Sequence, residues 1–339
     1  MFKKIEILII YIFFSLLNVP TFVFFGFLVR QELVGTTKLG MLSETALFLS
    51  EIPLIFKKFY NVQEVEDRFP LLEGFNGTPN LNESYLLLSR YDGDLKEGIV
   101  ELIDLTDFKV LNTWNPDINA FNKSVEKSLE FKNIDRDNNN QRQKLIHPTL
   151  TKDGGLLFTG GPLRKIDACS NLIFQNAHDQ FHHSLEKDAD DNIWVPSYMF
   201  PQSLPVEKVG RAYIYQDGYR DDAIVKLSSN GEILFEKSVS QIFIDNGLEY
   251  LLFSHGDMRF THDPIHLNDI QPVDFDGRFW KKGDVFLSLR HQSMVLLYRP
   301  SSNKIIWNGT GPFFHQHDVD ILNDHSISIF NNKSKHFSS

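Results

Sequence analysis

Residues 183–195, HSLEKDADDNIWV, contain the pattern that decides the fold. A histidine is followed by a polar stretch ending in an Asp-Asn turn, and an apolar run begins ten residues after the histidine, at Ile193. Asp and Asn directly before a β-branched or aromatic run are typical of a turn that leads into a strand. The segment therefore predicts a histidine, then a turn, then a buried strand.

The same order recurs along the chain, which indicates a repeat architecture. The pairs of histidine and first strand residue are His147 and Leu156, His183 and Ile193, His266 and Val285, and His317 and Ile327. Three pairs are separated by nine or ten residues, and the third is longer because it carries the insertion DGRFWKKG. An earlier segment that begins near Tyr85 has the same strand order without a matching histidine.

The repeated unit predicts an all-β chain. Each unit continues with further strands, the last of which ends near an aromatic residue: Trp114, Phe174, Phe235 or Trp307. Strand, turn, strand and a closing aromatic strand are typical of the four-stranded blades of a β-propeller. We therefore predict a β-propeller over residues 81–339, with a β-sandwich of irregular repeat as the main alternative.

Composition limits the function. The 34 Lys and Arg residues against 44 Asp and Glu residues leave a formal charge of −10 with histidine neutral. Because nucleic-acid binding requires a basic face, this balance argues against a nucleic-acid partner. The single cysteine, Cys169, excludes a disulfide framework, a zinc ribbon and a dithiol redox motif. We expect its thiol to be an inert part of the core.

The N-terminal segment has the features of a membrane anchor. Residues 7–29 carry no charged side chain, and 23 helical residues are long enough to cross a hydrocarbon core of roughly 30 Å. Lys3 and Lys4 precede the run, which places residues 1–6 in the cytoplasm and the remaining chain outside. A cleaved signal peptide is the alternative, but its apolar region is shorter.

Residues 40–60, GMLSETALFLSEIPLIFKKFY, follow as a separate element. Apolar side chains recur near helical spacing, which predicts a short amphipathic helix between the membrane and the propeller. The alternative is a helix packed on the surface of the domain itself. Pro53 is expected to kink or break this helix.

The propeller prediction also places the repeated histidines. The first strand of each blade lines the central channel, so residues at one repeated position point toward a common axis. His147, His183, His266 and His317 are therefore expected to converge. All twelve histidines lie between positions 147 and 336, which favours a site over random scatter. The alternative is that each histidine only hydrogen-bonds a carbonyl beside its turn.

Four segments resemble the signature segments of bacterial arylsulfate sulfotransferases. They are FHHSLEKDADDNIWV at 181–195, DPIHLNDIQPV at 263–273, GDVFLSLRHQSMV at 283–295 and FHQHDVDIL at 314–322. The resemblance implies a periplasmic, six-bladed propeller that uses neither a nucleotide sulfate donor nor another cofactor. It also implies transfer of a sulfuryl group from a phenolic sulfate ester to a phenol through a sulfated histidine.

By motif, the resemblance makes His317 the nucleophile and places His183, His266 and Arg290 around the transferring group. The chemistry suits these residue types. Arginine offers a planar pair of donors for sulfuryl oxygens, and a neutral imidazole is a competent nucleophile. Asp318 follows the nucleophile directly, and we expect it to point the other way because neighbouring side chains on a strand alternate.

The resemblance also bears on chain length and location. Five strand clusters begin near Tyr85, Leu156, Ile193, Val285 and Ile327. We therefore expect about 4.5 of the six blades, an incomplete C-terminal end and weak activity unless a partner completes the ring. With the N-terminal span, the expected location is the inner membrane, crossed once, with the propeller in the periplasm.

Two other functions remain open. The propeller could be a non-catalytic or truncated binding module, since a fold does not determine a function. Alternatively, the chain could be a metalloenzyme in which His262, His266, His315 and His317 hold an ion, although no carboxylate companion is evident. The insertion 199–220, with its three tyrosines, is either part of an acceptor pocket or a surface flap.

Overall fold

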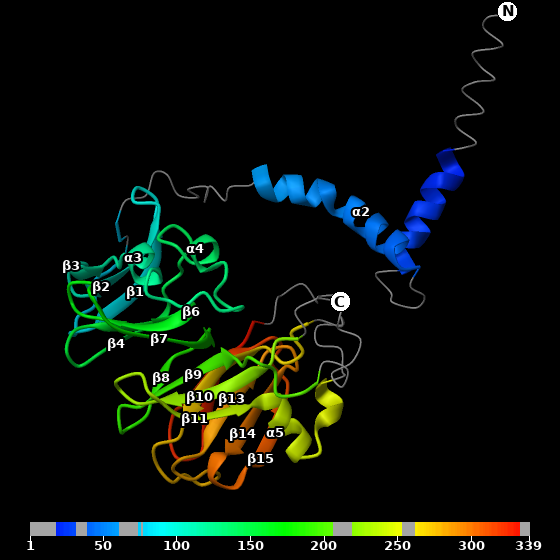
Figure 1. Ribbon diagram of the computed structural model, residues 1–339. Coiled ribbons are helices and arrows are strands. Elements are labelled where there is room, and N and C mark those ends of the chain that lie inside the picture. Colours follow the sequence, from blue (N-terminus) through cyan, green and yellow to red (C-terminus); the bar gives the residue numbers. More distant parts are fainter. Residues whose placement is uncertain are drawn as a thin grey trace, which may run out of the picture. The chain divides into compact units, whose positions relative to one another are not determined.

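The computed structural model describes residues 18–31, 39–60, 74–75, 77–205, 219–252 and 262–332 (Figure 1). The chain divides into two compact units, Met1–Leu71 and Leu72–Ser339. The first unit is helical where it is described, and the second consists mainly of β-strands.

The first unit contains two helical segments. Residues 18–31 are helical, and α2 spans Met41–Tyr60, which agrees with the helix predicted there. Helix α2 continues through Pro53 without a break. Residues 7–17 of the expected membrane span lie outside the described residues. Among the helices that are described, none is both long enough and apolar enough to cross a membrane.

The second unit is built from antiparallel sheets in which neighbouring strands follow one another along the chain, apart from one junction. The first sheet consists of β1 (Tyr85–Asp92), β2 (Glu97–Asp104) and β3 (Val110–Trp114). The second begins with β4 (Ile146–Leu150), β5 (Leu156–Thr159), β6 (Gly161–Ile166) and β7 (Leu172–Phe181). It continues with β8 (Glu186–Lys187), β9 (Ile193–Tyr198), β10 (Asp222–Leu227) and β11 (Ile233–Ser238).

The remaining strands form two smaller sheets. The third sheet is a four-stranded meander of β12 (Leu267–Pro272), β13 (Val285–Leu289), β14 (Met294–Arg299) and β15 (Lys304–Thr310). The fourth contains β16 (His317–Ile321) and β17 (Ile327–Phe330). All strand pairs are antiparallel, which confirms the prediction of a mostly β chain. Strands begin at each of the five predicted positions, whereas the number of blades stays a prediction.

Short helices fill some connections. They are α3 (Ile118–Asn122), α4 (Ile134–Asp137), α5 (Val239–Asp245) and the 3₁₀ turns η2 (Glu249–Leu252) and η4 (Pro300–Ser302). Cys169 lies in the turn between β6 and β7 and is exposed, so the prediction of a core thiol is wrong. The Asp167 carboxylate accepts backbone hydrogen bonds in this turn, and these bonds hold the cysteine outside the core.

The eight-stranded sheet consists of two halves joined by one long strand. The first part of β7 pairs with β6, while its last two residues, Gln180 and Phe181, pair with Tyr198 and Ser197 of β9. Strand β8 then pairs with the other end of β9. Strand β7 is therefore the last strand of the first half, and its end pairs with the second half, which begins at β8.

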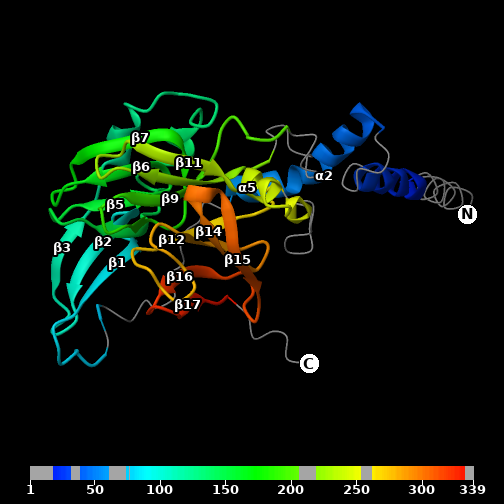
Figure 2. The same ribbon diagram turned by 90° about the horizontal axis from the view of Figure 1, so that it is seen from below.

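Apolar cores lie between consecutive sheets. Trp194 and Ile224 of the second sheet pack in one cluster with Ile270 and Leu296 of the third. Residues of β13 and β14 pack likewise against Val319 of β16. Strand β12 contacts β8 and β9 on one side and β16 on the other. The sheets thus follow one another around a central region, as Figure 2 shows.

The first strand of each sheet or half-sheet that follows a repeated histidine is called a leading strand here: β4, β8, β12 and β16. Each leading strand begins irregularly. His147, His183 and His266 have φ of 48°, 57° and 57°, and Asp318 beside His317 has φ of 54°. The registers of β4, β12 and β16 shift at these places. Such bulges turn side chains out of strict alternation and mark positions where a strand presents unusual groups.

Candidate functional site

A pocket of about 410 Å³ lies at the start of the leading strands. Its lining consists of Ile146, His147, His183, Ser184, Asn268, His317, Asp318, Phe330 and Asn332. Three of the four repeated histidines therefore reach one pocket. Asp318 lines it as well, so the expectation that it points away from His317 is wrong. The bulge at Asp318 interrupts the alternation on which that expectation depended.

Five imidazoles gather beside this pocket and form what we call the histidine cluster: His182, His183, His266, His291 and His317. The ring of His183 lies 4.9 Å from that of His266 and 6.2 Å from that of His317, measured between centroids. Three site residues predicted from separate segments are therefore neighbours in space.

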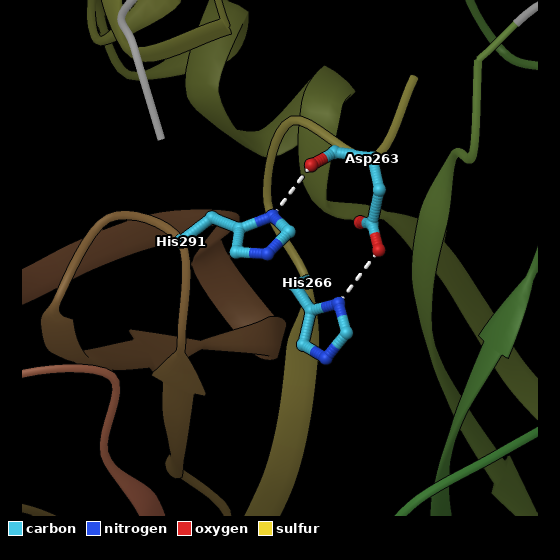
Figure 3. A group of neighbouring side chains, drawn as sticks. All are labelled: Asp263, His266 and His291. Carbon is cyan, nitrogen blue, oxygen red and sulfur yellow. Dashed lines mark hydrogen bonds and ion pairs between the residues drawn. The ribbon is translucent and has the colours of Figure 1, made fainter. Parts of the chain in front are cut away.

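Asp263 fixes two of these rings, as Figure 3 shows. Its Oδ2 accepts a hydrogen bond from Nδ1 of His266 at 2.6 Å, and its backbone carbonyl accepts one from Nδ1 of His291 at 2.6 Å. Burial opposes ionisation of this carboxyl group, but the His266 hydrogen bond and the nearby positive groups lower its pKa to about 2. Because both Nδ1 atoms donate to Asp263, the Nε2 atoms are left for other partners.

A second chain of contacts leads away from His183. Nδ1 of His183 lies 2.7 Å from Nδ1 of His182, and Nε2 of His182 lies 3.4 Å from Oδ1 of Asp222. His182 Nε2 and Asp222 Oδ1 are buried and lack hydrogen-bond partners among the described residues. Burial lowers the pKa of His182 well below 6.5 and raises the pKa of the Asp222 carboxyl group well above 3.8. Asp222 thus lies behind His182, which in turn fixes the ring of His183.

The ring of His317 has two contacts at Nδ1. Nδ1 lies 3.2 Å from the carbonyl oxygen of His315 and 2.7 Å from Nδ2 of Asn332, and which partner it serves depends on the tautomer. In the tautomer that donates to the carbonyl oxygen, Nε2 keeps its lone pair. Burial, with Arg290 and His266 nearby, lowers the pKa of His317.

Arg290 lies directly after β13, and its backbone N–H donates to the carbonyl of His266 at 3.0 Å. Burial, together with the positive charge of Arg290, lowers the pKa of both His291 and His317. Within the described part of the chain, no carboxylate pairs with this guanidinium. A guanidinium offers planar N–H donors of the kind that bind anions.

Burial also favours the neutral form of two further rings of the cluster, His183 and His291. Burial lowers the pKa of His183 to about 4, and burial likewise lowers that of His291. His147 is more exposed and accepts a hydrogen bond from the backbone N–H of Leu185 at 3.1 Å. It therefore lines the pocket without joining the cluster.

Comparison with protein-family models gives one match: residues 148–339 match the model described as arylsulfotransferase (ASST). The match covers more than half of the chain. The chain belongs to the arylsulfotransferase family. A search of the curated proteins finds no match.

Three of the solved structures that match this chain show low similarity to it. They are a protein of unknown function from Bacteroides caccae (11% identity, 68% of this chain and 60% of that one, TM-score 0.40), a chain of the mitotic checkpoint complex (7%, 74% and 63%, 0.34) and BamB from Moraxella catarrhalis (10%, 67% and 59%, 0.30). The arylsulfotransferase chain therefore spans about three fifths of the length of each.

The metal set considered from the sequence is not brought together in the described residues. Of His262, His266, His315 and His317, only His266 belongs to a group with metal-ligand spacing, and its companions there are Asp263 and His291. In that group the Nδ1 atoms and the Asp263 oxygens already bond to one another, as Figure 3 shows. The geometry of this group thus favours hydrogen bonding over metal ligation.

Part of the insertion at 199–220 reaches the site. Arg220 lies 3.6 Å from Asp263 and stacks over the ring of Tyr198, 4.8 Å from its centroid. Tyr219 is buried in the core. Tyr213 and Tyr215 lie outside the described residues, so the acceptor-pocket interpretation of the insertion stays a prediction. Sequence reasoning missed Tyr198, whose ring stacks on that of His182 at 4.0 Å between centroids, and Arg220, which lies beside Asp263.

Proposed function

We propose that this arylsulfotransferase moves a sulfuryl group from an aryl sulfate ester to a phenol, and that Nε2 of His317 carries the group between two half-reactions. The observation behind this proposal is the convergence of His183, His266 and His317 from three separate leading strands. The family match supports the class of reaction, and the neutral, anion-accepting cluster supports the assignment of the residues.

In the first half-reaction, the Nε2 lone pair of His317 attacks the sulfur atom, and the bond between sulfur and the aryl oxygen breaks. The departing phenolate requires a proton. His266 is suited to supply it when doubly protonated, because the ionised carboxylate of Asp263 bonds to its Nδ1 and leaves the Nε2 proton to be given. The products are a released phenol and a sulfated His317.

In the second half-reaction, the oxygen of an acceptor phenol attacks the same sulfur atom, and the bond between nitrogen and sulfur breaks. His266 now takes the phenol proton on Nε2 and returns to its starting state. A covalent intermediate of this kind divides one difficult displacement into two easier ones. No cofactor takes part in this scheme.

Arg290 and His183 are assigned to the sulfuryl oxygens. Sulfuryl transfer, like phosphoryl transfer, passes through a loose transition state whose charge lies on three oxygens. The guanidinium of Arg290 offers two parallel N–H donors. The buried ring of His183 offers a further N–H donor from Nε2 when its Nδ1 accepts from His182. Asn268, which lines the same pocket, adds a neutral side chain.

We also propose the finer form of the fold and its location. The four-stranded meander β12–β15 and the two halves of the eight-stranded sheet are taken as blades of a propeller, with the leading strands at its axis. Residues 7–29 are taken as a single inner-membrane anchor, on the charge pattern of the N-terminus. A C-terminal reporter fusion that is active only in the cytoplasm would contradict this topology.

The function is tested with the full chain, 4-nitrophenyl sulfate as donor and phenol as acceptor. Nitrophenol release and phenyl sulfate formation are followed together, with and without EDTA, at a temperature well below unfolding. We expect release to depend on the acceptor, with one phenyl sulfate formed per nitrophenol, and to persist in EDTA. Release of inorganic sulfate that stops on chelation would favour a metallohydrolase, and no release at all would favour a binding module.

A matched control accompanies the assay. His325→Ala changes an exposed histidine that pairs with Asp324, away from the histidine cluster. It should keep full activity, whereas His317→Ala should have none. Equal activity of the two variants would contradict the assignment of His317.

A further inference from the structure

A second group of ionisable side chains lies apart from the histidine cluster. His178 and Asp179 are adjacent on β7, and Glu236 lies on β11. One ligand atom from each lies within 4.8 Å of the others. Nε2 of His178 is 3.4 Å from Oε2 of Glu236. These residues, which we call the His178 group, share no member with the proposed catalytic site.

Two carboxylate oxygens in this group are buried without a partner. Asp179 is fully buried, and its Oδ2 accepts a hydrogen bond from the Ser197 hydroxyl at 2.9 Å. Its Oδ1, and Oε1 of Glu236, have no hydrogen-bond donor among the described residues. An unsatisfied buried carboxylate oxygen is costly, so native proteins pair such atoms with a donor or a cation.

The two carboxyl groups also approach each other closely. Burial and the contact with Glu236 raise the pKa of Asp179 to about 8. Glu130 adds a third negative group nearby: burial raises its pKa to about 7, and it interacts electrostatically with both His178 and Asp179. Two carboxylates at this separation cannot both be ionised unless a cation lies between them, and otherwise they must share a proton.

We propose that His178, Asp179 and Glu236 bind a divalent transition-metal ion, with Zn²⁺ as the best match. Imidazole and carboxylate donors suit zinc, whose ligands lie about 2.0–2.2 Å from the ion and therefore roughly 3.3–3.5 Å apart in a tetrahedron. The 3.4 Å separation of His178 Nε2 and Glu236 Oε2 fits such an edge. Water supplies the fourth ligand.

The ion has a structural role in this arrangement. It ties β11 to the part of β7 just before that strand passes from one half of the eight-stranded sheet to the other. Asn176 already donates to the carbonyl of Gly231 across the same junction at 2.8 Å. Because the ligands come from both sides of the junction, metal binding favours the folded state.

The test uses the full chain without a histidine tag, prepared without chelator. Metal content is measured by mass spectrometry before and after dialysis against EDTA, and the melting temperature is then followed as Zn²⁺ is added back. We expect about one zinc per chain, its loss in EDTA and a rise in melting temperature on reloading. We also expect about one proton to be released per zinc near pH 7, since the shared proton must leave.

Two variants and one control make the outcome specific. His178→Ala removes a half-exposed ligand and should weaken zinc binding by about tenfold or more. Glu236→Gln keeps the size of the side chain, should also lose the zinc response, and should raise the melting temperature of the metal-free protein. His325→Ala, an exposed histidine paired with a single carboxylate, should bind zinc like the unaltered chain.

The alternative is a proton shared by Asp179 and Glu236. In that case the chain holds no zinc, added zinc leaves the melting temperature unchanged, and no proton is released. Any of these results would overturn the proposal. None of them bears on aryl sulfate transfer, which is expected to persist both with and without EDTA.

Discussion

The histidine cluster and the His178 group contain the same types of ionisable side chain, but the two groups suit ligands of opposite charge. In the cluster, five imidazoles lie near Arg290, and two of them, His183 and His317, line the pocket. Burial favours the neutral form of His182, His183, His291 and His317 by lowering their pKa. In the His178 group, one imidazole meets carboxyl groups, and burial raises the pKa of Asp179 and Glu130.

The two sites differ in the charge of the partner that their side chains require. The cluster has Arg290 beside imidazoles whose neutral form burial favours, and these donors suit the anionic sulfate ester that we propose as its substrate. The His178 group has carboxylate oxygens without donors, so it accepts a cation or a proton. Burial alone does not determine the ligand of a site. The balance of donors and acceptors around it does.

Removing the proposed nucleophile should have the largest effect, because it should change the activity of one site and leave the other site as it is. His317→Ala should lower sulfuryl transfer by on the order of ten-thousandfold, because the variant removes the nitrogen that we propose as the nucleophile. Zinc binding at the His178 group should not change. The check is the steady-state rate of nitrophenol release beside a zinc titration. A variant with more than a tenth of the original rate would mean that another residue is the nucleophile.

Arg290→Lys tests whether the cluster needs a fork of donors or only a positive charge. An ammonium group cannot reproduce two parallel N–H contacts, so we expect a loss of about a hundredfold in kcat/KM. The charge remains, so the acid limb of the pH profile should stay where it is. Nearly unchanged kcat/KM would show that charge alone suffices.

Asp263→Asn tests the residue that fixes two rings at once. The amide can present its NH₂ to Nδ1 of His266 and favour the wrong tautomer, so we expect the general acid and base contribution to fall by about a hundredfold. A donor with a better leaving group, such as dinitrophenyl sulfate, should restore much of the first half-reaction. An equal loss with both donors would assign Asp263 a purely structural role.

The predicted and the missed features of the site differ in a physical way. The repeated spacing from histidine to strand was sufficient to predict the strand starts and the convergence of His183, His266 and His317, because one repeated position recurs in space. Contacts such as His182 with Asp222 depend on the packing of separate sheets. The exposed position of Cys169 depends on the Asp167 turn, and the direction of Asp318 depends on a bulge. Local sequence patterns do not encode these features.

The smallest expected effect is on stability against pH, and it has opposite signs at the two sites. His183 has a folded pKa of about 4, below its unfolded value near 6.5, so the unfolded chain binds more protons and stability falls as pH drops between these values. Asp179 has a folded pKa of about 8, above its unfolded value near 4, so in metal-free protein stability falls as pH rises between them.

Melting temperatures from pH 4 to 9 in EDTA resolve the two limbs. His183→Gln should flatten the acid limb only, and Glu236→Gln the alkaline limb only, because each removes one site's linkage. If both variants altered the melting temperature over the same pH range, the protonation of one site would depend on the charge of the other.

The central claim is that His317 carries the sulfuryl group, and the most direct measurement maps that group on the protein. The full chain is mixed with 4-nitrophenyl sulfate and no acceptor, stopped in alkali, where an N-sulfated imidazole survives, digested, and mapped by mass spectrometry. We predict a mass increase of one SO₃ group on the peptide that contains His317, absent in His317→Ala and removed by added phenol. Sulfation on another residue, or turnover without any sulfated peptide, would contradict the account.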